Sequence, residues 1–305
     1  MDEEFKPFRP AKPSGLEDID KLQEQALNEL KQDAEVYAVI HDELKLSRAE
    51  TKAALVELFA LQEDCRYCAA CPGYEECAKG IPHHRIKLVR DGDLVKRTFI
   101  SCPLAKEIEE YRAHFLVRDF PDEWANEGLK KSVERTGKKK EFLRAAIETL
   151  KGKSKRWLFV RGGLNDGRTF ALACLANDMV RTNNDYVVFA DTTSFFDKLK
   201  GLSINAKKDF ETLFKQYIAA PLLVLDDFGN EPKSSNDYTY ANIVYPLLNE
   251  RAKAGRVTCF SSDFTIEEIA SMYAKSIGVP RARQLQNLLS HLCGAEFDLS
   301  GLKVH

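Results

Sequence analysis

The sequence predicts an α/β domain, a parallel sheet with flanking helices, preceded by a small and mainly helical metal-binding domain that contains a β-hairpin. Three observations lead to this fold class. Strand and helix signals alternate from Arg156 onward, as they do in domains built on a parallel sheet. A glycine-rich loop joins the first of these strands to a helix. Five of the eight cysteines lie between Cys65 and Cys102, which packing alone does not explain.

The composition is typical of a soluble protein with a packed core. Among the 305 residues, 44% are hydrophobic and 30% are charged, and the formal net charge is -2. This near balance excludes a strong overall attraction to nucleic acid, so DNA contact requires a local basic patch. No apolar run approaches the roughly 18 residues of a membrane span, and the acidic first residues do not look like a signal peptide. We therefore expect a cytoplasmic protein with reduced cysteines.

Changes in residue pattern divide the chain into a flexible tail, a helical and Cys/His metal-binding domain, a connector and the α/β domain: residues 1–15, 16–118, 119–155 and 156–305. Apolar residues at helical spacing predict helices between Leu16 and Leu61, as a scaffold that can also serve as a docking surface. Alternating residues at 85–89 and 94–100, around a turn at 91–93, predict the hairpin. A helix from Leu104 to Phe115 follows it.

Cysteine and histidine residues at positions 62–104 are spaced like metal ligands. Thiolate and imidazole are the ligands that zinc prefers, in tetrahedral sets of four. The candidates outnumber such a set, and they are Cys68, Cys71, Cys77, His84 and Cys102. We expect Cys68, Cys71 and Cys102 to bind the metal. The fourth ligand is His84 or Cys77, and Cys65 is spare.

Two alternatives to zinc remain for this cluster. The spacing C-x2-C-x2-C with a distant Cys-Pro is also typical of iron–sulfur ligation. The cysteines can also be ordinary buried thiols. In either metal-bound case we expect the metal to stabilise a small, poorly cored domain rather than to perform chemistry.

A strand, a glycine-rich loop and a helix follow one another at residues 157–180. The loop matches the pattern G-x4-G-K-[ST] of phosphate-binding loops at every fixed position except one, where Arg168 replaces lysine. Its backbone N–H groups are expected to face phosphates, and the Thr169 hydroxyl to bind Mg²⁺. A guanidinium is larger than an ammonium and planar, so its approach to phosphate differs. The candidate nucleotide-binding residues are Gly162, Gly163, Asn165, Asp166, Gly167, Arg168, Thr169 and Asp226.

Two carboxylates follow the apolar strand at residues 221–225. We expect this strand to lie adjacent to the strand of the phosphate-binding loop, so that Asp226 reaches Mg²⁺ and Asp227 orients the attacking water. The alternative is a core strand with two solvated aspartates. A third strand, residues 257–263, ends in small polar residues that we expect near the γ-phosphate. Arg283, at the start of a later helix, is expected to reach the nucleotide of a neighbouring subunit or to be an ordinary surface arginine.

With these residues the chain resembles the bacterial helicase loaders of the DnaI/DnaC type, and the DnaI branch in particular. The resemblance extends from about residue 60 to residue 295, through Cys68–Gly73, Cys102-Pro103, the phosphate-binding loop, Asp226-Asp227, residues 258–264 and the Arg283 helix. It implies a zinc-binding domain that contacts the replicative helicase, and an AAA+ P-loop ATPase domain that binds ATP and single-stranded DNA. The implied role is helicase loading in replication initiation and primosome assembly, with other primosome proteins and further copies of the chain on the helicase ring as partners.

Three departures from the family pattern surround the expected γ-phosphate. Arg168 replaces lysine, Asp263 stands where the family has asparagine, and residues 284–289 lack the family's further arginines. Together they predict weak or absent hydrolysis even where nucleotide binds. A non-hydrolysing adaptor with a structural nucleotide site is therefore one alternative. An AAA+ helper of a transposase is another, but such proteins usually lack a Cys-rich module.

The resemblance also implies that the segment after the second sheet strand helps to hold single-stranded DNA. Here that segment contains Phe195, Phe196 and Leu199, with lysines nearby. Aromatic stacking combined with lysines suits single-strand binding. The helical spacing of the three apolar residues favours instead a buried helix face.

Overall fold

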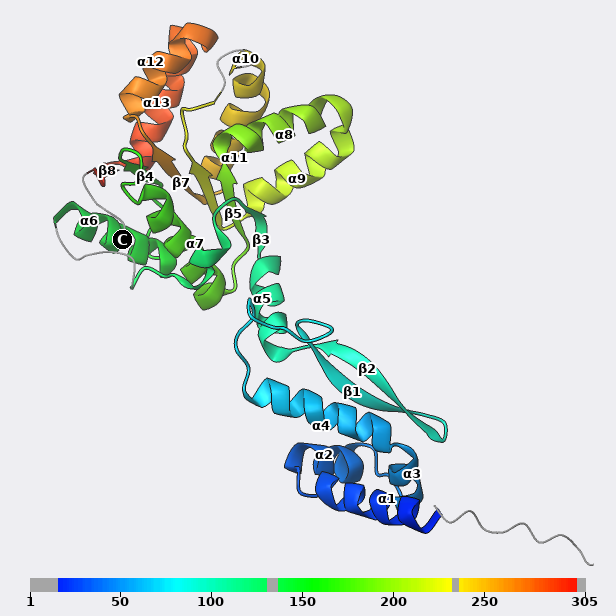
Figure 1. Cartoon of the computed structure of the whole chain (residues 1–305). Helices are drawn as coiled ribbons and strands as arrows, with labels where there is room; N and C mark the ends of the chain where they lie inside the picture. The colour runs from blue at the N-terminus through cyan, green and yellow to red at the C-terminus, as the bar shows by residue number, and fades with distance from the viewer. Residues whose placement is uncertain (1–15, 131–136, 232–235, 301–305) are drawn as a thin grey trace, which may run out of the picture. The chain divides into compact units, whose positions relative to one another are not determined.

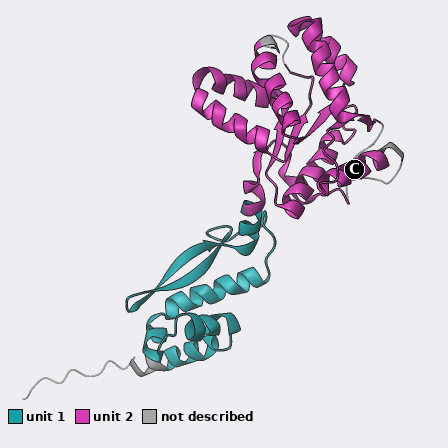
Figure 2. Cartoon of the chain, turned by 180° about the vertical axis from the view of Figure 1, so that it is seen from behind, with its two compact units in different colours: residues 1–109 teal, residues 110–305 magenta. Residues whose placement is uncertain are grey.

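The computed structural model describes residues 16–130, 137–231 and 236–300, so the tail predicted for residues 1–15 lies outside it (Figure 1). The chain splits into two compact units, the first ending at Glu109 and the second beginning at Glu110 (Figure 2). The sequence boundary was expected at residue 118. It lies earlier because Phe115–Arg118 forms a strand of the second unit's sheet. In the described ranges, helices long and apolar enough to cross a membrane are absent.

The first unit begins with a set of short helices: α1 (Leu16–Leu30), α2 (Ala34–Ala38), η1 (Val39–Glu43), α3 (Arg48–Ala53) and α4 (Leu55–Ala69). Ser47 caps α3 with a reciprocal pair of bonds, because its hydroxyl accepts the N–H of Glu50 and the Glu50 carboxylate accepts the N–H of Ser47. Helix α4 continues past Leu61 through Cys65 and Cys68. The expected loss of helix after Leu61 is therefore wrong, because Cys65 continues the buried face of the helix.

The predicted hairpin is confirmed as β1 (His84–Asp91) and β2 (Leu94–Ser101), which pair antiparallel. Helix α5 (Pro103–Ala113) follows. The hairpin contributes Leu88 to the small core of this unit. The other buried members of that core are Leu30, Val36, Ile40, Leu46, Ala54, Leu58, Leu61 and Cys65. Cys65 is thus a packing residue, and burial raises the pKa of its thiol to about 12.

A buried carboxylate joins the hairpin to α4. Asp64, 6% exposed, accepts the backbone N–H of Ile86 at 3.2 Å and forms an ion pair with Lys79. The Nε atom of Arg85 lies 3.9 Å from the same carboxylate. A buried charge is stable only when it is paired and hydrogen-bonded, and Asp64 meets both conditions.

The second unit contains the predicted parallel sheet. Its six described strands lie in the order β3-β5-β6-β7-β4-β8, and every pair is parallel. Their bounds are β3 (Phe115–Arg118), β4 (Leu158–Arg161), β5 (Val187–Asp191), β6 (Leu222–Asp226), β7 (Val257–Ser262) and β8 (Glu296–Asp298).

The order of the strands corrects one expectation. Strand β6, which ends at Asp226, does not lie beside β4, because β7 is inserted between them. The carboxyl ends of parallel strands nevertheless lie at one edge of the sheet. Asp226 and the loop after β4 therefore share that edge with the end of β7, which the sequence placed near the phosphates.

Helices cover both faces of the sheet (Figure 1). Alternate residues of β6 point to opposite sides: Leu223 and Leu225 pack in one core cluster, Leu222 and Val224 in the other. The second of these clusters is covered by α6 (Gly137–Leu150) and α7 (Arg168–Asn183), and η2 (Asp122–Asn126) packs on α7. The helices on the first cluster are α8 (Thr192–Asn205), α9 (Lys207–Ala219), α10 (Asn236–Thr239) with η4 (Tyr240–Val244), α11 (Tyr245–Lys253), α12 (Ile266–Ile277) and α13 (Val279–Cys293).

The apolar side chains of α8 belong to the core. Phe195, Phe196 and Leu199 are at most 3% exposed and pack in the first cluster. The buried-face interpretation is confirmed, and the expectation that these rings stack on DNA bases is wrong. The helical spacing of these residues was the better guide, because one face of α8 packs against β5 and α9.

Candidate functional site

The phosphate-binding loop, residues 162–167, joins β4 to α7. The N–H of Gly162 donates to the carbonyl of Ser262 at 3.2 Å, which fixes the start of the loop against β7. A Cβ atom at Gly162 would lie 3.0 Å from the Cβ of Asp166, so a side chain there would require Asp166 to shift. Gly167 has φ 75°, in the left-handed region that glycine adopts without strain.

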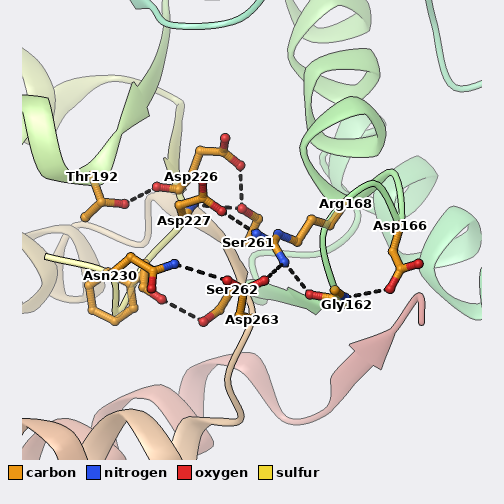
Figure 3. Close-up of polar contacts among 12 residues, drawn as sticks. Gly162, Asp166, Arg168, Thr192, Asp226, Asp227, Asn230, Ser261, Ser262 and Asp263 are labelled. Atoms are coloured by element: carbon orange, nitrogen blue, oxygen red, sulfur yellow. Dashed lines mark hydrogen bonds and ion pairs between the residues drawn. The ribbon is translucent and has the colours of Figure 1, made fainter. Parts of the chain in front are cut away.

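Asp166 folds back onto its own loop. Its Oδ2 atom accepts the N–H of Gly163 at 2.6 Å (Figure 3). Loops of this kind direct backbone N–H groups at phosphate oxygens. Because the Gly163 N–H donates to the carboxylate of Asp166, it already points toward an anionic group.

Asp226 is the buried acid of the site, with 6% of its surface exposed. The Ser261 hydroxyl donates to its Oδ1 atom, and the neighbouring Thr169 hydroxyl acts to lower the pKa of the same carboxyl. Burial raises the pKa of Asp226 to about 6, and the negative charge of Asp227 acts in the same direction. The loop threonine and the acid are thus neighbours, as two oxygen ligands of one hydrated Mg²⁺ would be.

Arg168 occupies the lysine position of the loop and is 7% exposed. Its Nη2 atom lies 2.5 Å from Oδ1 of Asp227, and its Nη1 atom donates to Oδ1 of Asp263 and to the carbonyl of Gly162 (Figure 3). Its Nε atom is buried and has no hydrogen-bond partner among the described residues. The guanidinium therefore lies between two carboxylates, which its planar fork engages together.

The two partners of Arg168 are held by the ends of β6 and β7. Asp227 has φ 56°, which is rare for a residue with a side chain, and its N–H donates to the Ser261 hydroxyl at 2.9 Å. Asp263 accepts a further bond from Nδ2 of Asn230 at 3.3 Å. Ser261 is one of the small polar residues that the sequence analysis expected near the γ-phosphate, whereas Asn230 was missed, because its role depends on the order of the strands.

A cavity of about 390 Å³ opens beside the loop, within the size range of small-molecule sites. Its lining residues are Trp124, Gly163, Leu164, Asn165, Asp166, Gly167, Arg168, Thr169, Phe170 and Asp227. The structure thus brings together most of the candidate nucleotide-binding residues. Trp124 and Phe170 were missed, and they meet edge to face with ring centroids 5.2 Å apart. Phe170 follows the threonine of the motif directly, but no sequence pattern connects it to Trp124.

Arg283 lies elsewhere. It is exposed on α13 and is not among the residues that line the cavity. Its expected contact with the nucleotide of a neighbouring subunit stays a prediction.

The candidate metal ligands come from several elements of the first unit. Cys68 lies on the last turn of α4, His84 begins β1, and Cys102 precedes α5; Cys71 and Cys77 lie between α4 and β1. The N–H of Cys102 donates to the carbonyl of His83 at 2.8 Å, which closes the base of the hairpin.

Three of the candidate sulfurs, those of Cys68, Cys77 and Cys102, accept a hydrogen bond from the chain. The His83 N–H donates to Cys77 at 3.4 Å, the Ala105 N–H to Cys102 at 3.3 Å, and the Lys79 ammonium to Cys68 at 3.5 Å. The first of these bonds lowers the pKa of the Cys77 thiol. Among the described residues, however, His, Cys, Asp and Glu side chains do not form a group of three or more that could hold a metal ion.

No protein-family model and no curated protein matches the chain. Solved structures do. A protein of Streptococcus pyogenes serotype M3 assigned as a primosome component has 16% identity, with a TM-score of 0.52 over 64% of this chain and 98% of its own. DnaI has 20% identity, with a TM-score of 0.51 over 61% of this chain and 97% of its own. The DnaC helicase loader has 17% identity and a TM-score of 0.49, over 58% and 99%.

At these identities the likeness concerns the fold. The parallel six-stranded sheet with flanking helices, with a glycine-rich loop after β4, is the fold that this chain shares with DnaI and with the streptococcal protein.

Proposed function

We propose that the chain is a helicase loader of DNA replication, which binds nucleotide in its second unit and delivers a replicative helicase onto single-stranded DNA. One observation carries the proposal. The phosphate-binding loop and the Asp226-Asp227 pair meet at one edge of a sheet whose fold DnaI shares. The Cys/His cluster before this domain supports the loader over the other AAA+ proteins considered, since transposase helpers usually lack it.

In this proposal a nucleotide binds in the cavity beside the loop. The N–H groups of residues 163–169 receive the phosphates at the start of α7. Thr169 and Asp226, which are neighbours, would hold Mg²⁺, and the ion would neutralise part of the phosphate charge. The aromatic rings of Trp124 and Phe170 offer an apolar wall for the base.

The first unit is proposed to contain structural zinc and to dock on the helicase. The residues are of the kinds that zinc binds, and backbone N–H groups donate to the sulfurs of Cys77 and Cys102 as they do around metal-bound cysteines. The Nδ1 atom of His84 lies 2.8 Å from the carbonyl of Pro82, so Nε2 is the nitrogen left for a metal. Elemental analysis of the purified chain distinguishes zinc from an iron–sulfur cluster. A chain free of both metals contradicts this part.

Contact with single-stranded DNA is assigned to charge rather than stacking. Lys198, Lys207 and Lys208 are exposed on α8 and α9, whereas the aromatic rings of α8 are buried. Lysines on the phosphate backbone make binding depend on salt. Lys207→Gln with Lys208→Gln should therefore weaken DNA binding and flatten its salt dependence, while Lys253→Gln with Lys275→Gln, on other helices, should not.

The decisive experiment uses the full chain and its cognate replicative helicase. Co-elution in size-exclusion chromatography measures formation of the complex. The rate at which the helicase displaces an oligonucleotide annealed to a single-stranded DNA circle measures loading. We expect a stable complex and faster loading. If the proteins elute separately and loading is unchanged, the loader proposal is wrong.

A non-hydrolysing adaptor is a second candidate, favoured by one specific contact. Asp227, expected to orient the attacking water, is instead ion-paired with Arg168. Turnover of ATP by the wild type and by Arg168→Lys separates the two candidates. Turnover that appears only in Arg168→Lys supports the adaptor, and turnover by the wild type supports the ATPase.

A further inference from the structure

Negative charges outnumber positive charges around Arg168, beside the phosphate-binding loop. One guanidinium contacts two carboxylates, those of Asp227 and Asp263. The side-chain surfaces of both carboxylates are 40% exposed, whereas that of Arg168 is 8% exposed. The group that should attract phosphate is thus covered, and the two groups that repel it face outward. The formal charge of these three side chains is negative.

This balance acts on one phosphate in particular. In loops of this pattern, the backbone N–H groups cradle the inner phosphates, while the lysine reaches the β- and γ-phosphates. The inner phosphates therefore need only the N–H donors, one of which, that of Gly163, already donates to an anionic group, the carboxylate of Asp166. A third phosphate must approach Asp227 and Asp263, and must also draw Arg168 away from them.

We propose that this site is selective for nucleoside diphosphates, and that Asp263 is the residue that disfavours the third phosphate. Asp227 follows a conventional strand end, where a carboxylate is expected in any ATPase of this kind. Asp263 is the additional negative charge. It follows β7, which lies directly beside β4, and it is held toward Arg168 while Asn230 donates to its other oxygen.

The cavity has the right composition for such a ligand. It combines loop residues 163–169 with the aromatic side chains of Trp124 and Phe170, so a base and two phosphates find complementary groups. Nothing in the inference depends on helicase loading. It rests only on the nucleotide site in the proposed function, and it names the ligand class of that site.

The experiment compares two ligands on the full chain by titration calorimetry. The ligands are ADP and the β,γ-methylene analogue of ATP, which cannot be hydrolysed to ADP. Each is titrated with Mg²⁺ and again with EDTA, because Mg²⁺ neutralises part of the phosphate charge. The proteins are the wild type, Asp263→Asn and the control Asp197→Asn, which removes an exposed charge from α8.

We expect the wild type to bind ADP at least about tenfold more tightly than the triphosphate, as like-charge repulsion in a specific site predicts. Removing Mg²⁺ should widen the ratio. Asp263→Asn should lower the ratio of the triphosphate Kd to the ADP Kd about tenfold, because the triphosphate binds more tightly while the affinity for ADP stays the same. Asp197→Asn should leave it unchanged.

Three results overturn the inference. The first is a wild type that binds the triphosphate as tightly as ADP, a measurement that needs no variant. The second is an equal change in both affinities in Asp263→Asn. The third is the absence of binding by either nucleotide, which also removes the nucleotide site from the proposed function but leaves co-elution with the helicase as a separate test of loading.

Discussion

Arg168 and Asp227 form an ion pair in which Nη2 and Oδ1 lie 2.5 Å apart, at the point where a phosphate-binding loop faces the acid that follows β6. The same guanidinium donates to Asp263, which follows β7. Arg168 at the start of α7, Asp227 after β6 and Asp263 after β7 therefore form one charged cluster. Its members should affect the stability of the fold together rather than independently.

The first prediction concerns this coupling. Arg168→Met leaves two carboxylates without their cation, whereas Asp263→Asn leaves a neutral acceptor for the same guanidinium. The partly exposed carboxylates moderate the effect, so we expect a coupling free energy of about 1–2 kcal/mol between positions 168 and 263. A double-mutant cycle in urea unfolding measures it. Additive effects of the two substitutions would show that the contact does not contribute to stability.

The second prediction concerns pH and Asp226. Burial raises the pKa of this carboxyl from 3.8 to about 6 in the folded chain. Between these values the folded state keeps a proton that the unfolded state has lost, so the free energy of unfolding falls as the pH rises. Relative to Asp226→Asn, which does not titrate, the wild type should lose about 2–3 kcal/mol from pH 4 to pH 7.

Urea unfolding in EDTA at several pH values measures this difference. Asp197→Asn, at an exposed position, is the matched control and should not alter the pH dependence. Parallel stability curves for the wild type and Asp226→Asn would contradict the assigned pKa. The wild type should also bind Mg²⁺ with nucleotide more tightly as the pH rises through 6, because only the ionised carboxylate is a good ligand.

The sequence predicts those parts of this structure that depend on local pattern. The hairpin, the strand–loop–helix around residues 162–167 and the strand before Asp226 all follow from alternation or motif spacing, and all are found. The four-residue strand Phe115–Arg118 is too short to show a period, so its place in the sheet was missed. The helix was expected to end at Leu61, whereas α4 ends at Ala69, because Cys65 and Cys68 were assigned to a metal-binding segment rather than to a helix.

The arrangement around Arg168 depends on distant contacts. Its departure from lysine is visible in the sequence, and so is Asp263. Their pairing joins residues 95 positions apart, and it requires β7 to lie between β6 and β4. Spacing along the chain does not determine the order of strands in a parallel sheet, because each crossover can place a strand on either side. For the same reason Trp124 could not be assigned to the site.

The third prediction uses Trp124 as a reporter. The chain has two tryptophans, and Trp157 is buried with its Nε1 bonded to the carbonyl of Arg256 at 2.9 Å. In Trp157→Phe, only Trp124 remains, on the wall of the cavity. Nucleotide binding should change its emission. Trp124→Ala should weaken binding about tenfold, since base–aromatic stacking contributes roughly 1–3 kcal/mol.

Trp157→Phe serves as its own control, because a buried residue outside the cavity should not alter nucleotide affinity. If Trp124 emission in Trp157→Phe does not change at saturating ADP, the base of the nucleotide does not lie against Trp124. The same variant also reports whether ADP and a triphosphate bind in one position.

The fourth prediction concerns Arg251, which is buried at the opposite edge of the sheet. Its Nε donates to the Thr258 hydroxyl at 3.0 Å, and Nη2 donates to the carbonyl of Val257. Its Nη1 atom donates to the carbonyls of Tyr217, Ile218 and Ala220. The side chain therefore joins α11 to the end of α9 and to the amino ends of β6 and β7.

Arg251→Met should lower the free energy of unfolding by about 3 kcal/mol or more, because several buried carbonyls lose their donor together. Arg251→Lys should recover only part of this, since an ammonium cannot span the same acceptors. Arg256→Met, at an exposed position, should change stability by less than about 0.5 kcal/mol. Because the proposed nucleotide site lies at the carboxyl edge, ADP affinity measured well below the melting temperature should be the same in all these variants. A loss of affinity in Arg251→Met would show that the two edges of the sheet are coupled.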